Sequence, residues 1–170
     1  DRLAKEQDPE QKKFLQEQLE EANQTKAAGQ QDAIHYFRIA MSFADAETSV
    51  EEVNIVRYFL CYLHWKTEAY LESALMGEFI AKRYPGSPTA KDCAKIAMAS
   101  YLRLYTAGTE EDREFETQHV IGICDYITKQ WPAEPEAAEA FNTLIPFMIK
   151  TGKLDQARAY VAGIQDDSPN

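Results

Sequence analysis

Residues 79–101, FIAKRYPGSPTAKDCAKIAMASY, decide the fold of this chain. They are typical of the end of one amphipathic helix, a Tyr-Pro-Gly-Ser-Pro break and the start of the next helix. Residues 126–145, YITKQWPAEPEAAEAFNTLI, repeat this arrangement, and both copies contain an aromatic residue followed by Pro-x-x-Pro-x-Ala. A helix-to-helix corner that recurs in this way predicts a helical repeat array.

The composition is that of one helical domain. The chain has 170 residues, of which 45% are apolar, and this length allows a substantial core. Valine and isoleucine rarely alternate with polar residues, so no strand pattern is present. The seven prolines gather at apparent breaks between helical patterns. An all-α fold is therefore predicted.

Eight helices in four antiparallel pairs are expected from the helical spacing of apolar residues and from the capping signals between them. Asp8 with Pro9 is typical of a helix start, and Ser49 with Glu52 forms a capping box. The expected helices open near Asp8, Gln30, Ser49, Thr67, Ser87–Pro88, Thr109, Pro135 and Leu154.

Two regions are distinguished along the chain. Residues 1–29 are predicted to form a polar N-terminal helix, which could be the first helix of the array, and residues 30–170 a helical repeat domain. The helix over residues 50–63 is apolar almost all round, so we expect other elements to cover it on several sides. The last helix is expected to end at Gln165, before a frayed terminus.

The net charge of −10 argues against a nucleic-acid partner, because binding to phosphates needs a basic face. Its simplest role is to keep the protein soluble. No apolar run is long enough to span a membrane, so direct membrane insertion is not expected. Because the chain starts at Asp1 without a methionine, we interpret it as a processed or excised piece, and the sequence leaves open whether a targeting segment preceded it.

Three cysteines, Cys61, Cys93 and Cys124, lie inside apolar helical patterns. Their odd number does not suit a disulfide framework, and their wide spacing does not suit a zinc site. We predict that they are buried thiols that act as small hydrophobic residues.

One register fits four helices of the chain. A first residue, which is small in three copies, is followed by apolar or small residues at offsets of 4 and 7. In three copies a proline follows at an offset of 12. The four sets are Ala33, Phe37, Ala40 and Asp45; Ser73, Gly77, Ile80 and Pro85; Val120, Cys124, Ile127 and Pro132; and Ala157, Val161, Ile164 and Pro169.

This register resembles the second helix of the tetratricopeptide repeat, and GKLDQARAYV at residues 152–161 is the best single match. The corner at residues 84–101 resembles the divergent arrays of bacterial envelope proteins, such as outer-membrane assembly lipoproteins and TolA-binding proteins. The spacing departs from the family's 34 residues, and the first helices lack its Trp and Leu-Gly signature. A generic helical bundle with prolines at its corners is the alternative.

The resemblance implies a soluble, non-catalytic scaffold without a cofactor, which binds a protein or a peptide. It favours the bacterial envelope or periplasm, although the residues themselves leave localisation open. First helices of the family line a concave face that holds peptides. If the family's repeat register applies to this chain, the concave face contains Tyr58, Tyr62, Lys95, Asn142 and Lys150. The alternative is that the tyrosines are core residues with their hydroxyls at the edge.

Two other functions were considered. Asp32-x-x-His35 and Glu116-x-x-His119 resemble part of a di-iron site in a helical bundle, and such a metalloenzyme needs two further inward carboxylates. Solvated histidines are the simpler interpretation, and no nucleophile–histidine or phosphate-binding motif is present. The chain could also be a purely architectural segment of a longer repeat protein, with no ligand of its own.

Overall fold

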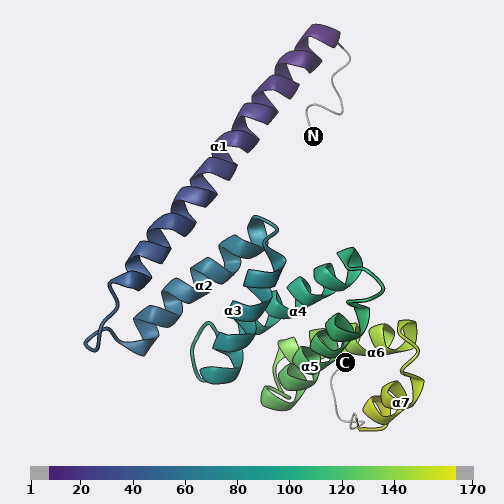
Figure 1. Cartoon of the computed structure of the whole chain (residues 1–170). Coiled ribbons are helices and arrows are strands. Elements are labelled where there is room, and N and C mark those ends of the chain that lie inside the picture. Colours follow the sequence, from purple (N-terminus) through teal and green to yellow (C-terminus); the bar gives the residue numbers. More distant parts are fainter. Residues whose placement is uncertain (1–7, 164–170) are drawn as a thin grey trace. The chain divides into compact units, whose positions relative to one another are not determined.

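The computed structural model describes residues 8–163, which form seven α-helices and no strand (Figure 1). This confirms the all-α prediction. The helices are α1 (Pro9–Ser42), α2 (Val50–Lys66), α3 (Tyr70–Arg83), α4 (Ala90–Ala107), α5 (Arg113–Gln130), α6 (Pro135–Lys150) and α7 (Leu154–Gly163). The chain divides into two compact units at Phe43 and Ala44, and each unit is described by itself.

The first unit contains a single long helix, α1. Asp8 caps it as expected, because its carboxylate accepts a hydrogen bond of 3.0 Å from the Glu10 amide. Two helices were expected here, but α1 continues through Gly29 and Gln30, so the described part of the chain has seven helices instead of eight. The physical reason is that this region contains no proline, and one exposed glycine costs a helix only about 1 kcal/mol.

The second unit begins with α2, whose start follows the sequence signal. Ser49 and Glu52 form the predicted capping box, in which each side chain bonds to the backbone of the other residue. The expectation that α2 is covered on several sides is wrong for part of its surface. The helix packs against α3 and α4, whereas Ile55 and Phe59 are exposed.

In the corner between α3 and α4, the second helix starts later than expected. A helix was predicted to open at Ser87–Pro88. That helix begins at Ala90 after Thr89, so Pro88 lies in the preceding turn and is not the first helical residue. No side chain caps the start of α4. The Ser87 hydroxyl pairs with the Thr89 hydroxyl, at 3.2 Å, and does not bond to a backbone amide of the helix. Its carbonyl instead accepts a hydrogen bond of 3.0 Å from the Ala90 amide, which closes the turn.

The C-terminal ends of α3 and α5 have the same local structure. Tyr84 ends α3 with φ −133° and ψ 57°, and Trp131 ends α5 with φ −132° and ψ 57°. Each residue also packs its ring edge-on against the aromatic residue five positions earlier, Phe79 or Tyr126. The two helix ends that precede the shared sequence motif therefore have the same conformation.

The turns after α2 and α6 are a second matching pair. The hydroxyls of Thr67 and Thr151 each donate a hydrogen bond of 2.9 Å to the carbonyl four residues earlier. The next residue has a positive φ in both turns, 62° at Glu68 and 76° at Gly152. The helix break expected near Thr67 is confirmed, and the same turn recurs at Thr151.

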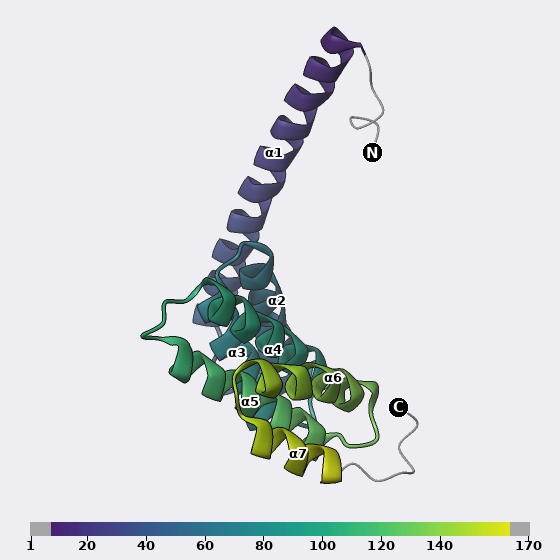
Figure 2. The ribbon, with the colours of Figure 1, turned by 90° about the vertical axis from the view of Figure 1, so that its right-hand side faces the viewer.

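Consecutive helices of the second unit pack against each other, as the two views in Figures 1 and 2 show. In addition, α4 contacts both α2 and α6. The predicted burial of the three cysteines is confirmed, since each is 0% exposed. The hydrophobic core cluster consists of Ala74, Ala81, Ala94, Ala97, Met98, Tyr101, Val120, Ile123, Cys124, Ile127, Ala140, Leu144, Phe147, Met148 and Ala157.

The structure describes only some residues of the fourth register set, which begins at Ala157. Ala157 is buried as its register position requires, whereas Ile164 and Pro169 lie outside the described residues. The same holds for the expected end of the last helix at Gln165. Helix α6 runs through Pro146, which is exposed.

Candidate functional site

The candidate site is the surface formed by the exposed sides of α2, α4 and α6, which we call the α2–α4–α6 face. Because α4 packs against both other helices, the three helices adjoin within one unit. All five residues expected to approach a ligand lie on these helices: Tyr58 and Tyr62 on α2, Lys95 on α4, and Asn142 and Lys150 on α6.

The two tyrosines of α2 differ in their surroundings. Tyr58 is half-buried, and burial, followed by the nearby charge of Asp92 on α4, raises the pKa of its hydroxyl. Tyr62 is 39% exposed, and the Lys66 ammonium lies 5.2 Å from its ring centroid. Tyr58 therefore faces the neighbouring helix α4, whereas Tyr62 presents an open aromatic surface.

Lys95 connects the middle of the face to α6. Its ammonium lies 2.9 Å from the Glu139 carboxylate, and this hydrogen bond raises the pKa of the lysine. One turn earlier, Lys91 lies 3.0 Å from Glu134 of the segment that precedes α6. Lys95 was expected to be available to a ligand, but in this structure it is engaged across the α4–α6 contact.

The two remaining residues lie at different places along α6. Asn142 is exposed, one turn beyond Glu139. Lys150 is in the last turn of α6, and its ammonium lies 5.7 Å from the ring centroid of Tyr105, which packs edge-on against Phe147. The structure thus brings Tyr58 close to α4 and Lys95 close to α6, whereas Lys150 belongs to a separate cluster around Tyr105.

A polar cluster that sequence reasoning missed lies between α3, α4 and α5. Glu78 is at its centre, with the Lys82 ammonium 2.5 Å from one carboxylate oxygen. The Tyr101 hydroxyl donates a hydrogen bond to the other oxygen, and His119 Nδ1 lies 3.8 Å from the same atom. The imidazole stacks on the Tyr101 ring, with centroids 4.8 Å apart. Only the Glu78–Lys82 spacing of four residues is visible in the sequence.

This cluster stabilises the charged form of Glu78. Burial alone raises the pKa of the carboxyl, but the hydrogen bonds from Lys82 and Tyr101 outweigh burial, so the net pKa is lowered. Tyr101 itself is only 2% exposed. Tyr101 is therefore a core residue whose hydroxyl bonds to the Glu78 carboxylate.

The histidines do not all have the environment that was expected. His64 is only 5% exposed, so the expectation of solvated histidines is wrong at this position, where the last turn of α2 packs against its neighbours. His35 is exposed on α1, and His119 is half-buried between Tyr101 and Phe115.

The metal-site hypothesis gains no support from the placement of its residues. Glu116 lies against Gly108, where an added Cβ would meet its carboxylate at 2.5 Å, and burial raises the pKa of this carboxyl. His119 instead lies beside Glu78. Within residues 8–163 no three His, Cys, Asp or Glu side chains are grouped so that they could hold a metal ion. The metalloenzyme stays a hypothesis.

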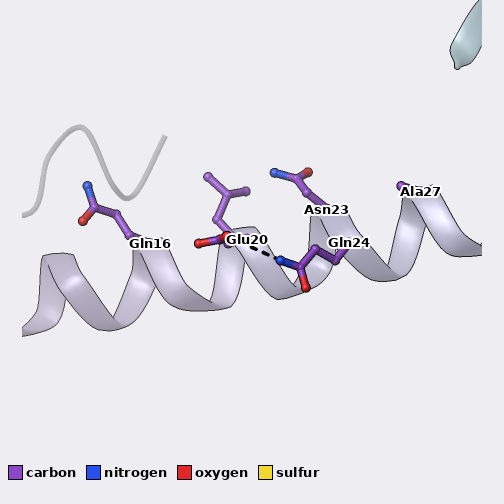
Figure 3. A pocket seen from close by; sticks show the side chains of 6 residues that line it. Gln16, Glu20, Asn23, Gln24 and Ala27 are labelled. Carbon is purple, nitrogen blue, oxygen red and sulfur yellow. Dashed lines mark hydrogen bonds between the residues drawn. The ribbon is translucent and has the colours of Figure 1, made fainter. Parts of the chain in front are cut away.

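Hollows also lie along α1 and beside the α3–α4 corner. One follows a single side of α1, where Figure 3 shows the Gln24 amide hydrogen-bonded to Glu20 at 3.4 Å. Its lining residues are Gln16, Leu19, Glu20, Asn23, Gln24 and Ala27. Another, of about 520 Å³, lies between the first turn of α2 and the α3–α4 corner, and it is lined by Val50, Glu51, Asn54, Tyr84, Gly86, Ser87 and Pro88.

Comparison with known proteins adds no family assignment. No protein-family model and no curated protein sequence matches this chain. In the part of the chain that the structure describes, no helix has both the length and the apolar character needed to cross a membrane.

Proposed function

We propose that this chain is a non-catalytic helical-repeat module that binds a peptide segment of a partner protein on the α2–α4–α6 face. The observation that carries the proposal is the packing of α4 against both α2 and α6. Alternate helices that adjoin in this way can present one extended surface to a ligand, as stacked helix pairs of solenoid proteins do.

The matching local structures support a repeat built from the pairs α2–α3, α4–α5 and α6–α7. Tyr84 and Trp131 end the second helices of two pairs with the same backbone angles. Thr67 and Thr151 join the helices of two pairs with the same hydrogen bonds. Repeated sequence signals that produce repeated conformations favour a tetratricopeptide-like array over a generic bundle.

The side chains of the face favour a basic peptide. Tyr62 offers an exposed aromatic ring, a group that often dominates binding energy at interfaces. Lys91 and Lys95 already pair with acids of the α6 region, and no ion pair within the described residues involves Asp92 or Glu136. A Lys or Arg side chain of the ligand would complement these carboxylates.

Selection of peptides from a random display library, with the whole chain as bait, tests the proposal. We expect enriched peptides to contain Lys or Arg and to bind more weakly as salt concentration rises. For one enriched peptide, Tyr62→Ala should weaken binding about tenfold, because loss of an interface aromatic costs more than about 1 kcal/mol. The matched control is Leu71→Ala, which truncates an exposed apolar residue on α3 and should leave the affinity unchanged.

The outcomes separate the parts of the proposal. Failure to enrich any peptide would favour a purely architectural segment. An acidic or neutral consensus would contradict the argument from charge. Equal losses of affinity in the Tyr62 and Leu71 variants would place the binding surface elsewhere.

A further inference from the structure

The hollow between the first turn of α2 and the α3–α4 corner, which we call the corner pocket, has the size of a small-ligand site. Its volume of about 520 Å³ lies within the range of roughly 300–1,000 Å³ that is usual for such sites. Val50, Tyr84 and Pro88 give the pocket apolar walls, whereas Glu51 and Asn54 bring polar groups from α2.

Asn54 places an unused hydrogen-bond donor in the wall of this pocket. The residue is only 2% exposed, and its Oδ1 accepts a hydrogen bond of 3.1 Å from Arg57 Nη1. Because a guanidinium can only donate, this bond fixes which end of the amide is the oxygen. Within residues 8–163 the Asn54 Nδ2 group donates to no other residue. Since buried donors nearly always have a partner, an acceptor in the pocket would complete the site.

Arg57 is itself held in place, so it can orient the amide. Its guanidinium carbon lies 5.3 Å from the ring centroid of Phe79 and 5.8 Å from that of Tyr84. Both rings belong to the C-terminal part of α3. The Asn54 side chain is therefore fixed between α2 and the α3–α4 corner before any ligand binds.

Glu51 is the charged residue of the lining. It and Glu52 are the two acids in the first turn of α2, but the Glu52 carboxylate already accepts hydrogen bonds from the Ser49 amide at 3.1 Å and the Ser49 hydroxyl at 2.8 Å. Glu51 is exposed, and in the part of the chain that the structure describes no ion pair involves it. Because Asn54 follows Glu51 by three residues, the two side chains lie on the same side of the helix.

We propose that the corner pocket binds a primary ammonium group next to a carbonyl group, which is the chemistry of the amino end of a peptide or of a free amino acid. The ammonium pairs with the Glu51 carboxylate, and the adjoining carbonyl accepts a hydrogen bond from Asn54 Nδ2. An apolar side chain of the same ligand residue packs against Val50 and Tyr84. The proposal does not depend on the proposed function, because no residue expected to hold the peptide lines this pocket.

Other ligand groups satisfy only part of the site. A Lys or Arg side chain would pair with Glu51, but it contains no acceptor for Asn54. A carboxylate alone would accept from Asn54, but Glu51 would repel it. The ammonium and the carbonyl oxygen of one amino-terminal residue are held close together by covalent geometry, which suits two side chains one helical turn apart.

Titration of the whole isotope-labelled chain with leucyl-alanine amide, a dipeptide whose amino group is free, tests the proposal by amide chemical shifts in NMR spectra. We expect saturable shifts centred on Val50, Asn54 and Gly86, with a dissociation constant in the millimolar range for so small a ligand. The N-acetylated dipeptide lacks the charge and should bind at least about tenfold more weakly. Free leucine identifies the source: equal or tighter binding of leucine assigns the site to amino acids, and weaker binding assigns it to peptides.

Two charge-matched variants locate the ammonium. Glu51→Gln keeps the shape of the side chain and should weaken binding of the dipeptide about fivefold, as expected for loss of a partly exposed ion pair. Glu47→Gln removes the same charge from an exposed residue outside the lining and should leave the affinity unchanged. Tyr62→Ala should also leave it unchanged, which separates this site from the α2–α4–α6 face. None of these variants alters the buried Asn54.

Equal affinities for the free and the acetylated dipeptide would overturn the proposal. So would equal losses in the Glu51 and Glu47 variants, shifts centred on Asp92 and Glu136 instead of the pocket, or no saturable shift up to about 10 mM dipeptide.

Discussion

At the scale of single residues, side chains that are near in the sequence cap the starts of α1 and α2. Asp8 and the Ser49–Glu52 pair bond to backbone atoms at most three residues away, so their roles follow from spacing alone. Ser87 offered a similar signal, yet its hydroxyl pairs with Thr89 and the helix begins later. The choice between such alternatives depends on the turn conformation, which spacing does not determine.

The Glu78 cluster shows what a single sequence does not reveal. Its partners come from three helices, and Tyr101 and His119 are 23 and 41 residues away along the chain. No local pattern links residues at such separations. Only the packing of α3, α4 and α5 places these side chains together.

A pH-dependent loss of stability is predicted for Glu78→Gln. Because the folded-state pKa of Glu78 is lowered from 4.5, its contribution is fully present above that value and is lost as pH falls through the folded-state pKa. At pH 7 the substitution should cost about 1–2 kcal/mol, the range for hydrogen bonds to a partly exposed charged group. Urea unfolding of both proteins at pH 7 and pH 3 measures the effect. An equal cost at both pH values would contradict the role of the carboxylate.

At the scale of helices, the extent of a helix was harder to predict than its presence. The segment at Gly29 contains no proline and no cap, so nothing in it ends α1. By contrast, the turns at Thr67 and Thr151 end their helices with side-chain hydrogen bonds. A break is therefore predicted best where a specific turn chemistry is present, and not where the apolar pattern merely weakens.

Helix packing gives a matched pair of glycine predictions. Gly77→Ala places a Cβ 2.5 Å from the Cys93 carbonyl oxygen, so α3 and α4 must separate. We expect a loss of about 1–3 kcal/mol, which is typical of overpacking. Gly122→Ala on α5 meets nothing within 4 Å and should stabilise by about 0.5–1 kcal/mol through helix propensity. Urea unfolding measures both variants. A stabilised Gly77→Ala protein would refute the close α3–α4 contact.

At the scale of the whole second unit, contacts between side chains of different helices were harder to predict than the helices themselves. Recurring corners predicted helix pairs, and in the structure α4 contacts both α2 and α6. A tetratricopeptide-like stacking of these pairs stays a prediction. The register placed Lys95 on the exposed face, but it could not show that Glu139 occupies its ammonium. An ion pair across two helices depends on their exact rotation, which the register leaves undetermined.

The central claim is that the α2–α4–α6 face binds a peptide. Titration of the isotope-labelled chain with an enriched basic peptide, followed by amide chemical shifts in NMR spectra, tests it most directly. We expect the largest shifts around Tyr62, Lys95 and Asn142. Largest shifts around Leu75 of α3 and Phe115 of α5, with the α2–α4–α6 face unchanged, would contradict it.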